Sequence, residues 1–296
     1  MNIEELHIQP GQERKGAVHE KRTREESIER IHQAFIEAGK TNLVEWLKTP
    51  EMHDVYERII FLDQYTEFVQ DELNGILGGE EVIATLEQEG NRWNKNECEA
   101  FEKGSLLSDI SKTGPHEATH EEQLLIIEMY SKENIRVTMT IGEFFDEKFP
   151  RDAAQRKAQF AHMKDKMHFG KTDVLSLTME DFYNQHSQWT YNFVKTLSIA
   201  PAVQRAASLH HKLKGDFVPE LVTAPYDRVA QLVNLMDLYD AFTTRSRMEP
   251  AQALDIIKTK FIDLPRNAQY SGELHTLYSA MQTTFLSEQI PMRTAA

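Results

Sequence analysis

The apolar residues of this chain follow helical spacing almost throughout. In the segment after Glu25 they fall at Ile28, Ile31, Phe35 and Ile36, three or four residues apart, as on one face of a helix. No stretch of useful length alternates apolar and polar residues in the way that predicts a half-buried strand. The pattern therefore predicts an all-α protein.

Proline and glycine residues divide this pattern into separate helices. The first helical region continues through Leu47 and is interrupted at Thr49-Pro50. The next helix is predicted from His53 to about Leu77, with its end at Gly78-Gly79, and residues 80–110 carry a weaker helical pattern. Beyond them we predict helices at roughly 119–131, 134–148, 152–166, 179–197, 201–211, 225–244, 249–262 and 270–287.

A break in the pattern between residues 110 and 117 predicts a domain boundary. Gly114-Pro115 would end any helix there. We expect residues 1–24 to be a mobile polar arm, residues 25–112 to be an N-terminal helical domain and residues 113–296 to be a second helical domain.

The N-terminal helices carry apolar faces but no catalytic constellation. Ile31 and Phe35 on one helix, and Ile59 and Leu62 on another, must be covered by other apolar groups. Two interpretations remain open. The helices either form a homodimer or protein-partner interface, with a regulatory or dimerising role, or they extend one core shared with the C-terminal helices.

Composition and charge restrict the classes of partner. The 296 residues carry a formal net charge of −14, which disfavours binding along a nucleic-acid polymer. Hydrophobic residues make up 40 % of the chain, enough for a packed core, yet no run approaches the ~20 apolar residues of a membrane span. The single cysteine, Cys98, excludes an intramolecular disulfide, and the polar N-terminus lacks the apolar centre of a signal peptide. We therefore expect a cytoplasmic protein.

The adjacent residues His210 and His211 are the strongest chemical signal. Successive helix side chains point about 100° apart, so two neighbouring histidines converge only where the chain turns, and Gly215 predicts such a helix end. Asp237 stands in an apolar helix, where an unpaired carboxylate is costly. Imidazoles beside a buried carboxylate suit a divalent transition metal. Two structural alternatives stay open: the histidines can cap a helix end, and Asp237 can be hydrogen-bonded within the fold.

Several segments taken together resemble the HD superfamily and, within it, the HD-GYP domains of cyclic-dinucleotide signalling. The resemblance covers about residues 119–262. "MDLYDAFTTR" is similar to the family's Ala-Asp-x-Tyr-Asp-Ala-Leu-Thr helix, and "HHKLKGDFVP" to its His-His-Glu…Gly-Tyr-Pro stretch. "AHMKDK" resembles the segment that ends in His-Asp-x-Gly-Lys, and "LTMEDFYNQHSQWTYNFV" resembles the segment that carries a further histidine ligand.

This resemblance implies a helical HD-domain-like bundle and a set of site residues. The implied metal ligands are His162, His186, His210, His211 and Asp237, and Glu133 stands at the position of a further family ligand. Asp165 is an additional candidate from helix geometry, because it lies three residues after His162 and shares its helix face. The implied phosphate-binding residues are Lys214, Arg245 and Arg247. The implied cofactor is iron, manganese or zinc, as one ion or at partial occupancy. The implied ligand is a cyclic dinucleotide.

Two family motifs are altered in this chain, and this changes the expected function. Met163 stands where the resemblance expects the bridging aspartate, and Phe217-Val218-Pro219 replaces Gly-Tyr-Pro. A bridging carboxylate holds the two metal ions of a phosphodiesterase together, which a thioether cannot do. We therefore expect a degenerate HD-GYP-like signalling protein that binds a nucleotide or protein partner with little or no hydrolysis. The alternatives are an active metal-dependent phosphodiesterase with rearranged ligands and a purely structural helical scaffold.

A second metal motif, His-Glu-x-x-His, is present at residues 116–120, but its neighbouring residues disfavour a zinc site. On a helix this spacing places two zinc ligands on one face. Here Gly114-Pro115 precedes it and Glu121-Glu122 follows it, so the sequence predicts a polar helix start instead.

Overall fold

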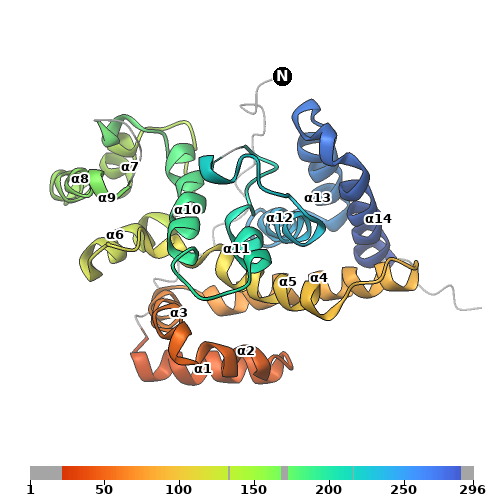
Figure 1. The fold of residues 1–296 in the computed structure, drawn as a ribbon. Helices are drawn as coiled ribbons and strands as arrows, with labels where there is room; N and C mark the ends of the chain where they lie inside the picture. The colour runs from red at the N-terminus through yellow and green to blue at the C-terminus, as the bar shows by residue number, and fades with distance from the viewer. Residues whose placement is uncertain (1–21, 133, 168–172, 216, 288–296) are drawn as a thin grey trace, which may run out of the picture.

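The computed structural model describes residues 22–132, 134–167, 173–215 and 217–287. These residues form fourteen α-helices and no strand, which confirms the predicted all-α class (Figure 1). One isolated antiparallel bridge joins Thr140 and Thr178. The arm predicted at residues 1–24 lies almost wholly outside the described residues. No helix in the described ranges combines the length and the apolar character that crossing a bilayer requires.

The first five helices lie close to their predicted positions. Thr23 and Asn94 cap the first and the fifth of them, and in each case the glutamate three residues later completes a capping box. The bounds are α1 Arg24–Glu37, α2 Thr41–Leu47, α3 His53–Tyr65, α4 Phe68–Gln88 and α5 Lys95–Ser108, followed by the short 3-10 turn η3, Ile110–Thr113.

The helix predicted from His53 to Leu77 is wrong in two respects. The chain breaks at Thr66, whose backbone is extended and whose hydroxyl accepts a hydrogen bond from the amide of Phe68. Gly79 then lies inside α4 and does not end it. A Cβ atom at Gly79 would lie 2.0 Å from Cζ of Phe101, so this glycine permits close packing of α4 on α5.

The later helices match their predicted order, with shorter bounds. The helix predicted at 134–148 begins only at Ile141, because Thr140 caps it with Glu143. The bounds are α6 His120–Tyr130, α7 Ile141–Lys148, α8 Ala153–His162, α9 Lys164–Met167, α10 Met179–Val194, α11 Pro201–Ser208, α12 Arg228–Asp240, α13 Pro250–Ile257 and α14 Ser271–Ser287. The π-helical segments 241–245 and 258–262 extend α12 and α13.

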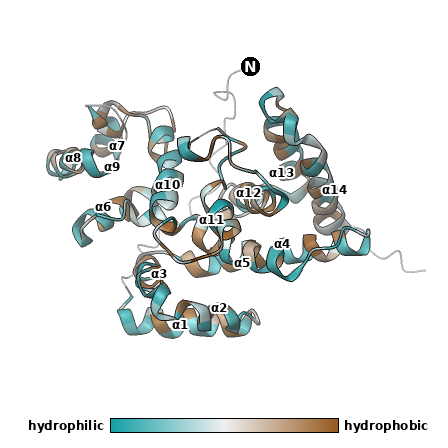
Figure 2. Ribbon diagram, in the orientation of Figure 1, coloured by the Kyte–Doolittle hydropathy of each residue, from teal (hydrophilic) through white to brown (hydrophobic). Residues whose placement is uncertain are grey.

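Two hydrophobic clusters form the interior. The first joins helices α1–α5 with α11–α14, and the second joins α6–α9; α10 contributes Phe193 to the first and Trp189 to the second. Figure 1 shows α10 between the lobe of α6–α9 and the remaining helices, and Figure 2 shows hydrophilic residues on the outward sides of peripheral helices such as α1 and α6. The end of α5 meets α10 and α11 in the middle of the molecule.

Buried Arg58 of α3 holds the segment that follows η3. Its guanidinium donates to the Thr113 hydroxyl at 2.5 Å and to the carbonyl of His116 at 3.3 Å, and it lies 4.5 Å from the ring centre of Phe193. Burial lowers the pKa of Arg58 to about 10. The domain boundary predicted between residues 112 and 113 falls within η3, and it stays a prediction.

Candidate metal centre

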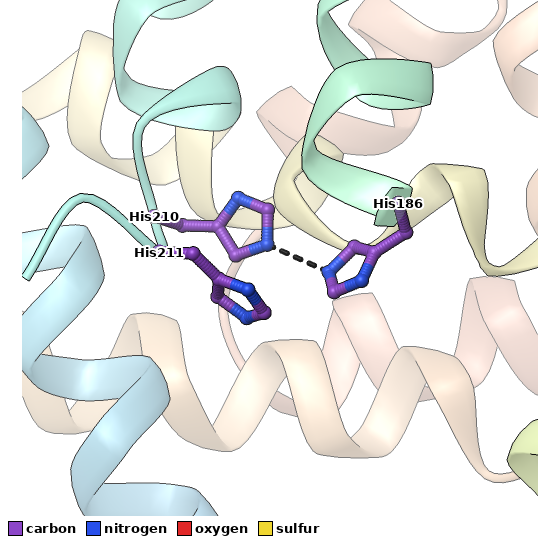
Figure 3. Close-up of side chains that lie close together, drawn as sticks. All are labelled: His186, His210 and His211. Carbon is purple, nitrogen blue, oxygen red and sulfur yellow. Dashed lines mark hydrogen bonds between the residues drawn. The ribbon is translucent and has the colours of Figure 1, made fainter. Parts of the chain in front are cut away.

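Three buried histidines meet in the middle of the molecule. His186 comes from α10, and His210 and His211 come from the turn that follows α11, as the sequence predicts for an adjacent histidine pair (Figure 3). Each side chain offers one ring nitrogen, and these three nitrogens lie within 4.8 Å of one another. We call these residues the histidine cluster. Its geometry could hold a metal ion.

Hydrogen bonds fix the tautomers of two of these imidazoles. Nδ1 of His186 donates to the carbonyl of Tyr183 at 2.5 Å, and Nδ1 of His210 donates to the carbonyl of Ala207 at 2.6 Å. The Nε2 atoms of the two rings face each other at 2.8 Å, which is hydrogen-bond distance, so one proton or a metal ion can lie between them. Nitrogens that bind one zinc ion tetrahedrally at about 2.1 Å each lie roughly 3.4 Å apart, so the two rings would separate slightly to bind it.

Burial keeps His210 and His211 in the neutral form that binds metals. Burial, followed by the proximity of His186, lowers the pKa of His210 to about 4. Burial and the nearby Lys214 lower the pKa of His211 well below its usual value. At neutral pH, protons therefore compete little with a metal for these nitrogens.

Asp109 supplies a carboxylate that the sequence-based prediction omits. It lies between α5 and η3, and its Oδ1 is 3.0 Å from Nε2 of His186 and 3.9 Å from Nε2 of His210. Its other carboxylate oxygen pairs with Lys112. Burial alone would raise the pKa of Asp109, but Lys112 and the histidines outweigh it and hold this pKa well below the usual value. The carboxylate is thus ionised and faces the point where the imidazoles converge.

A sequence signal for Asp109 exists in the residues around it. Ser108-Asp-Ile-Ser-Lys112 keeps the aspartate and the lysine of the His-Asp-x-Gly-Lys pattern, with serine in place of both histidine and glycine. The segment at 161–166, to which the resemblance assigned this pattern, does not join the cluster. His162 and Asp165 are exposed, and Met163 is fully buried in the second hydrophobic cluster.

Asp237 lies at the edge of the histidine cluster. Its Oδ2 is 3.7 Å from Nε2 of His211 and 3.5 Å from Nζ of Lys214, and its side chain is 14 % exposed. Asp237 therefore lies near His211, at a distance longer than a direct hydrogen bond. Thr244, on the next turn, donates to Asp240.

Glu72 of α4 has a carboxyl group that interacts electrostatically with Asp109, and the sequence-based prediction omits it. Burial, and then the negative charge of Asp109, raise the pKa of Glu72 well above its usual value. Tyr130 lies against the histidine cluster: its ring stands perpendicular to His186, with ring centres 5.9 Å apart.

The remaining predicted residues lie elsewhere. Arg247 is exposed and has a left-handed backbone with φ of 52°, Arg245 belongs to the π-helical segment after α12, and Glu133 is outside the described residues. The His-Glu-x-x-His motif straddles the start of α6, where Thr119 is the cap. Its two histidines are exposed, which agrees with the predicted polar helix start.

No family model, curated protein or solved structure matched the chain. What the site can hold therefore follows from its donor atoms. Imidazoles and a carboxylate are donors that iron, manganese and zinc accept in proteins. The orienting hydrogen bonds from Nδ1 to backbone carbonyls are also typical of histidines that bind metals through Nε2.

Proposed function

We propose that this protein is a degenerate HD-GYP-like signalling protein that holds one iron, manganese or zinc ion and regulates a partner with little or no phosphodiester hydrolysis. One observation carries the proposal. The Nε2 atoms of His186 and His210 and the Oδ1 atom of Asp109 converge on one buried point. His211 and Asp237 complete the donor set.

The family resemblance supports this proposal once its aspartate is taken as Asp109. The pattern at residues 108–112 then precedes His186, the pair His210-His211 and Asp237 in the order that the resemblance implies. Met163 is no longer the residue that replaces the bridging aspartate. The histidine before that aspartate is replaced by Ser108, whose hydroxyl donates to the carbonyl of Ser105 at 2.7 Å.

Two features favour a single ion and weak hydrolysis. An aspartate that bridges two ions uses both carboxylate oxygens, but Oδ2 of Asp109 pairs with Lys112. The three histidines form one group, with ring nitrogens within 4.8 Å of one another, and such a group suits a single ion. A single ion supports a regulatory role better than turnover, which needs two ions to clamp the phosphodiester.

We expect purified protein to carry at most about one equivalent of iron, manganese or zinc, because the donors converge on one point. Elemental analysis of the purified protein measures it. The double variant His210→Ala, His211→Ala and the single variant Asp109→Asn should each lose most of this metal. His275→Ala is the matched control, because exposed His275 also pairs with an aspartate, Asp263, at 3.2 Å. Equal metal in wild type and the double variant would overturn the assignment.

We expect hydrolysis of cyclic di-GMP by the metal-loaded protein to stay close to background, because one ion cannot clamp both oxygens of the displacement. Chromatography of the products after incubation with iron, manganese or zinc checks this. Robust turnover that disappears in His211→Ala would contradict the regulatory proposal and favour the active phosphodiesterase.

A further inference from the structure

His211 differs from the other two histidines of the cluster in the contact that its Nδ1 makes. Nδ1 of His186 and of His210 each donates to a backbone carbonyl. Nδ1 of His211 is buried and has no hydrogen-bond partner in the described part of the chain. A buried polar atom of this kind is costly unless a water molecule or another group satisfies it.

Two serine hydroxyls in the same place share this property. Ser187 follows His186 on α10 and Ser208 ends α11, and each is 1 % exposed with no hydrogen-bond partner for its Oγ among the described residues. Both serines and His211 line one cavity of about 10 Å³. A polar cavity of about this size holds one water molecule, which needs two to four polar partners.

We propose that this cavity binds one structural water molecule that orients His211 as a metal ligand. The Nδ1–H group of His211 donates to the water oxygen, and the water exchanges hydrogen bonds with the hydroxyls of Ser187 and Ser208. The inference rests on the proposed metal-binding function, since it names the groups that position one of its ligands. Ser187 and Ser208 are thus positioning residues that act on the metal through the water and His211.

The size of the cavity restricts its occupant to one water-sized molecule. Leu209, Lys212, Gly215, Phe217 and Val218 supply the rest of its wall, and a volume of about 10 Å³ has no room for an ion with its hydration shell. With Nδ1 protonated, Nε2 of His211 keeps its lone pair. That nitrogen is the one that lies 3.7 Å from Asp237. The water therefore gives His211 the same tautomer that backbone carbonyls give the other two histidines.

The test compares the double variant Ser187→Ala, Ser208→Ala with wild type and with Ser27→Ala. Ser27 is a matched control because it is also fully buried with a hydroxyl that has no partner among the described residues, but it lies on α1. Zinc affinity is measured by competition with a chelator. The tautomers of the imidazoles are read from ¹⁵N spectra of the metal-free protein.

We expect the double variant to bind zinc about tenfold more weakly and to show one imidazole with a changed tautomer. Ser27→Ala should change neither. Unchanged affinity and unchanged imidazole spectra in a folded double variant would overturn the inference. If the double variant does not fold, a high-resolution crystal structure of wild type decides: electron density for a water within hydrogen-bond distance of Nδ1 of His211 supports the inference, and a cavity without density overturns it.

Failure of the proposed function has a different signature. In that case wild type itself would not bind zinc, iron or manganese. The imidazole spectra and the electron density for the water would still decide whether Ser187 and Ser208 orient His211.

Discussion

At the scale of single residues, His210 combines complete burial with a hydrogen bond from its Nδ1 to the carbonyl of Ala207, which directs its Nε2 towards His186 and Asp109. Its low pKa means that the folded, metal-free protein resists protonation at a pH where the unfolded chain accepts a proton. The same applies to His211. The site therefore makes stability depend on pH in a defined window.

We expect the free energy of unfolding of the metal-free protein to decrease as the pH falls from 6.5 towards 4. Between these values the unfolded chain binds more protons than the folded chain, because the pKa of His210 is about 4 in the fold and 6.5 outside it. Urea denaturation at a series of pH values measures the slope. His210→Gln should reduce this slope, and an identical slope in the variant would show that His210 is not the group responsible.

The sequence identifies the histidines of the site better than its carboxylates. An adjacent histidine pair before a glycine predicts convergence at a turn, and the structure places His210 and His211 there. Asp109 was not predicted because the segment around it has serine at both positions where the His-Asp-x-Gly-Lys pattern has histidine and glycine. Glu72 was not predicted because a glutamate in an amphipathic helix is ordinarily a solvated residue. Its interaction with Asp109 depends on how α4 packs in the fold, which the sequence does not state.

At the scale of the helices, a glycine can end a helix or permit close packing inside one, and the sequence alone does not distinguish these two roles. Gly78-Gly79 predicts a helix end, but α4 continues to Gln88, because Gly79 lets the ring of Phe101 approach the backbone. Helix starts have a clearer sequence pattern. A threonine or an asparagine followed three residues later by an acidic residue caps α1, α5, α6, α7 and α10.

Two glycines of α4 provide a matched test of this packing. Gly79→Ala should destabilise the protein by about 1–3 kcal/mol, because the new methyl group would overlap Phe101. Gly75→Ala should stabilise it by roughly 0.5–1 kcal/mol, because a Cβ there meets nothing within 4 Å and alanine favours the helix. Thermal unfolding followed by circular dichroism measures both. Equal effects of the two substitutions would contradict the close approach of α4 and α5.

At the scale of the whole molecule, the N-terminal helices share apolar surface with the helices that carry the site. The first hydrophobic cluster includes Phe101 of α5, Val203 of α11 and Leu235 of α12. A Cβ at Gly104 would lie 2.5 Å from Cβ of Ala206, so α5 and α11 are in close contact. This packing favours the interpretation of a shared core over a separable N-terminal domain.

We therefore expect a fragment of residues 112–296 to aggregate or remain unfolded, because removing α4 and α5 exposes the apolar faces of α11 and α12. Size-exclusion chromatography with light scattering and circular dichroism measure this. A fragment of residues 22–296 is the control, because it keeps every described helix. A monomeric, helical 112–296 fragment would instead support an N-terminal domain that serves association.

The donors of the metal centre are far apart along the chain, and this determines when the centre can exist. Asp109 leaves the ribosome long before His186, the pair at His210 and His211, and Asp237. A nascent chain therefore presents no complete set of ligands until α12 has been synthesised and has packed. Loading of an ion at the proposed centre would therefore follow the synthesis of α12, and a bound ion would join segments whose separation makes their encounter entropically costly.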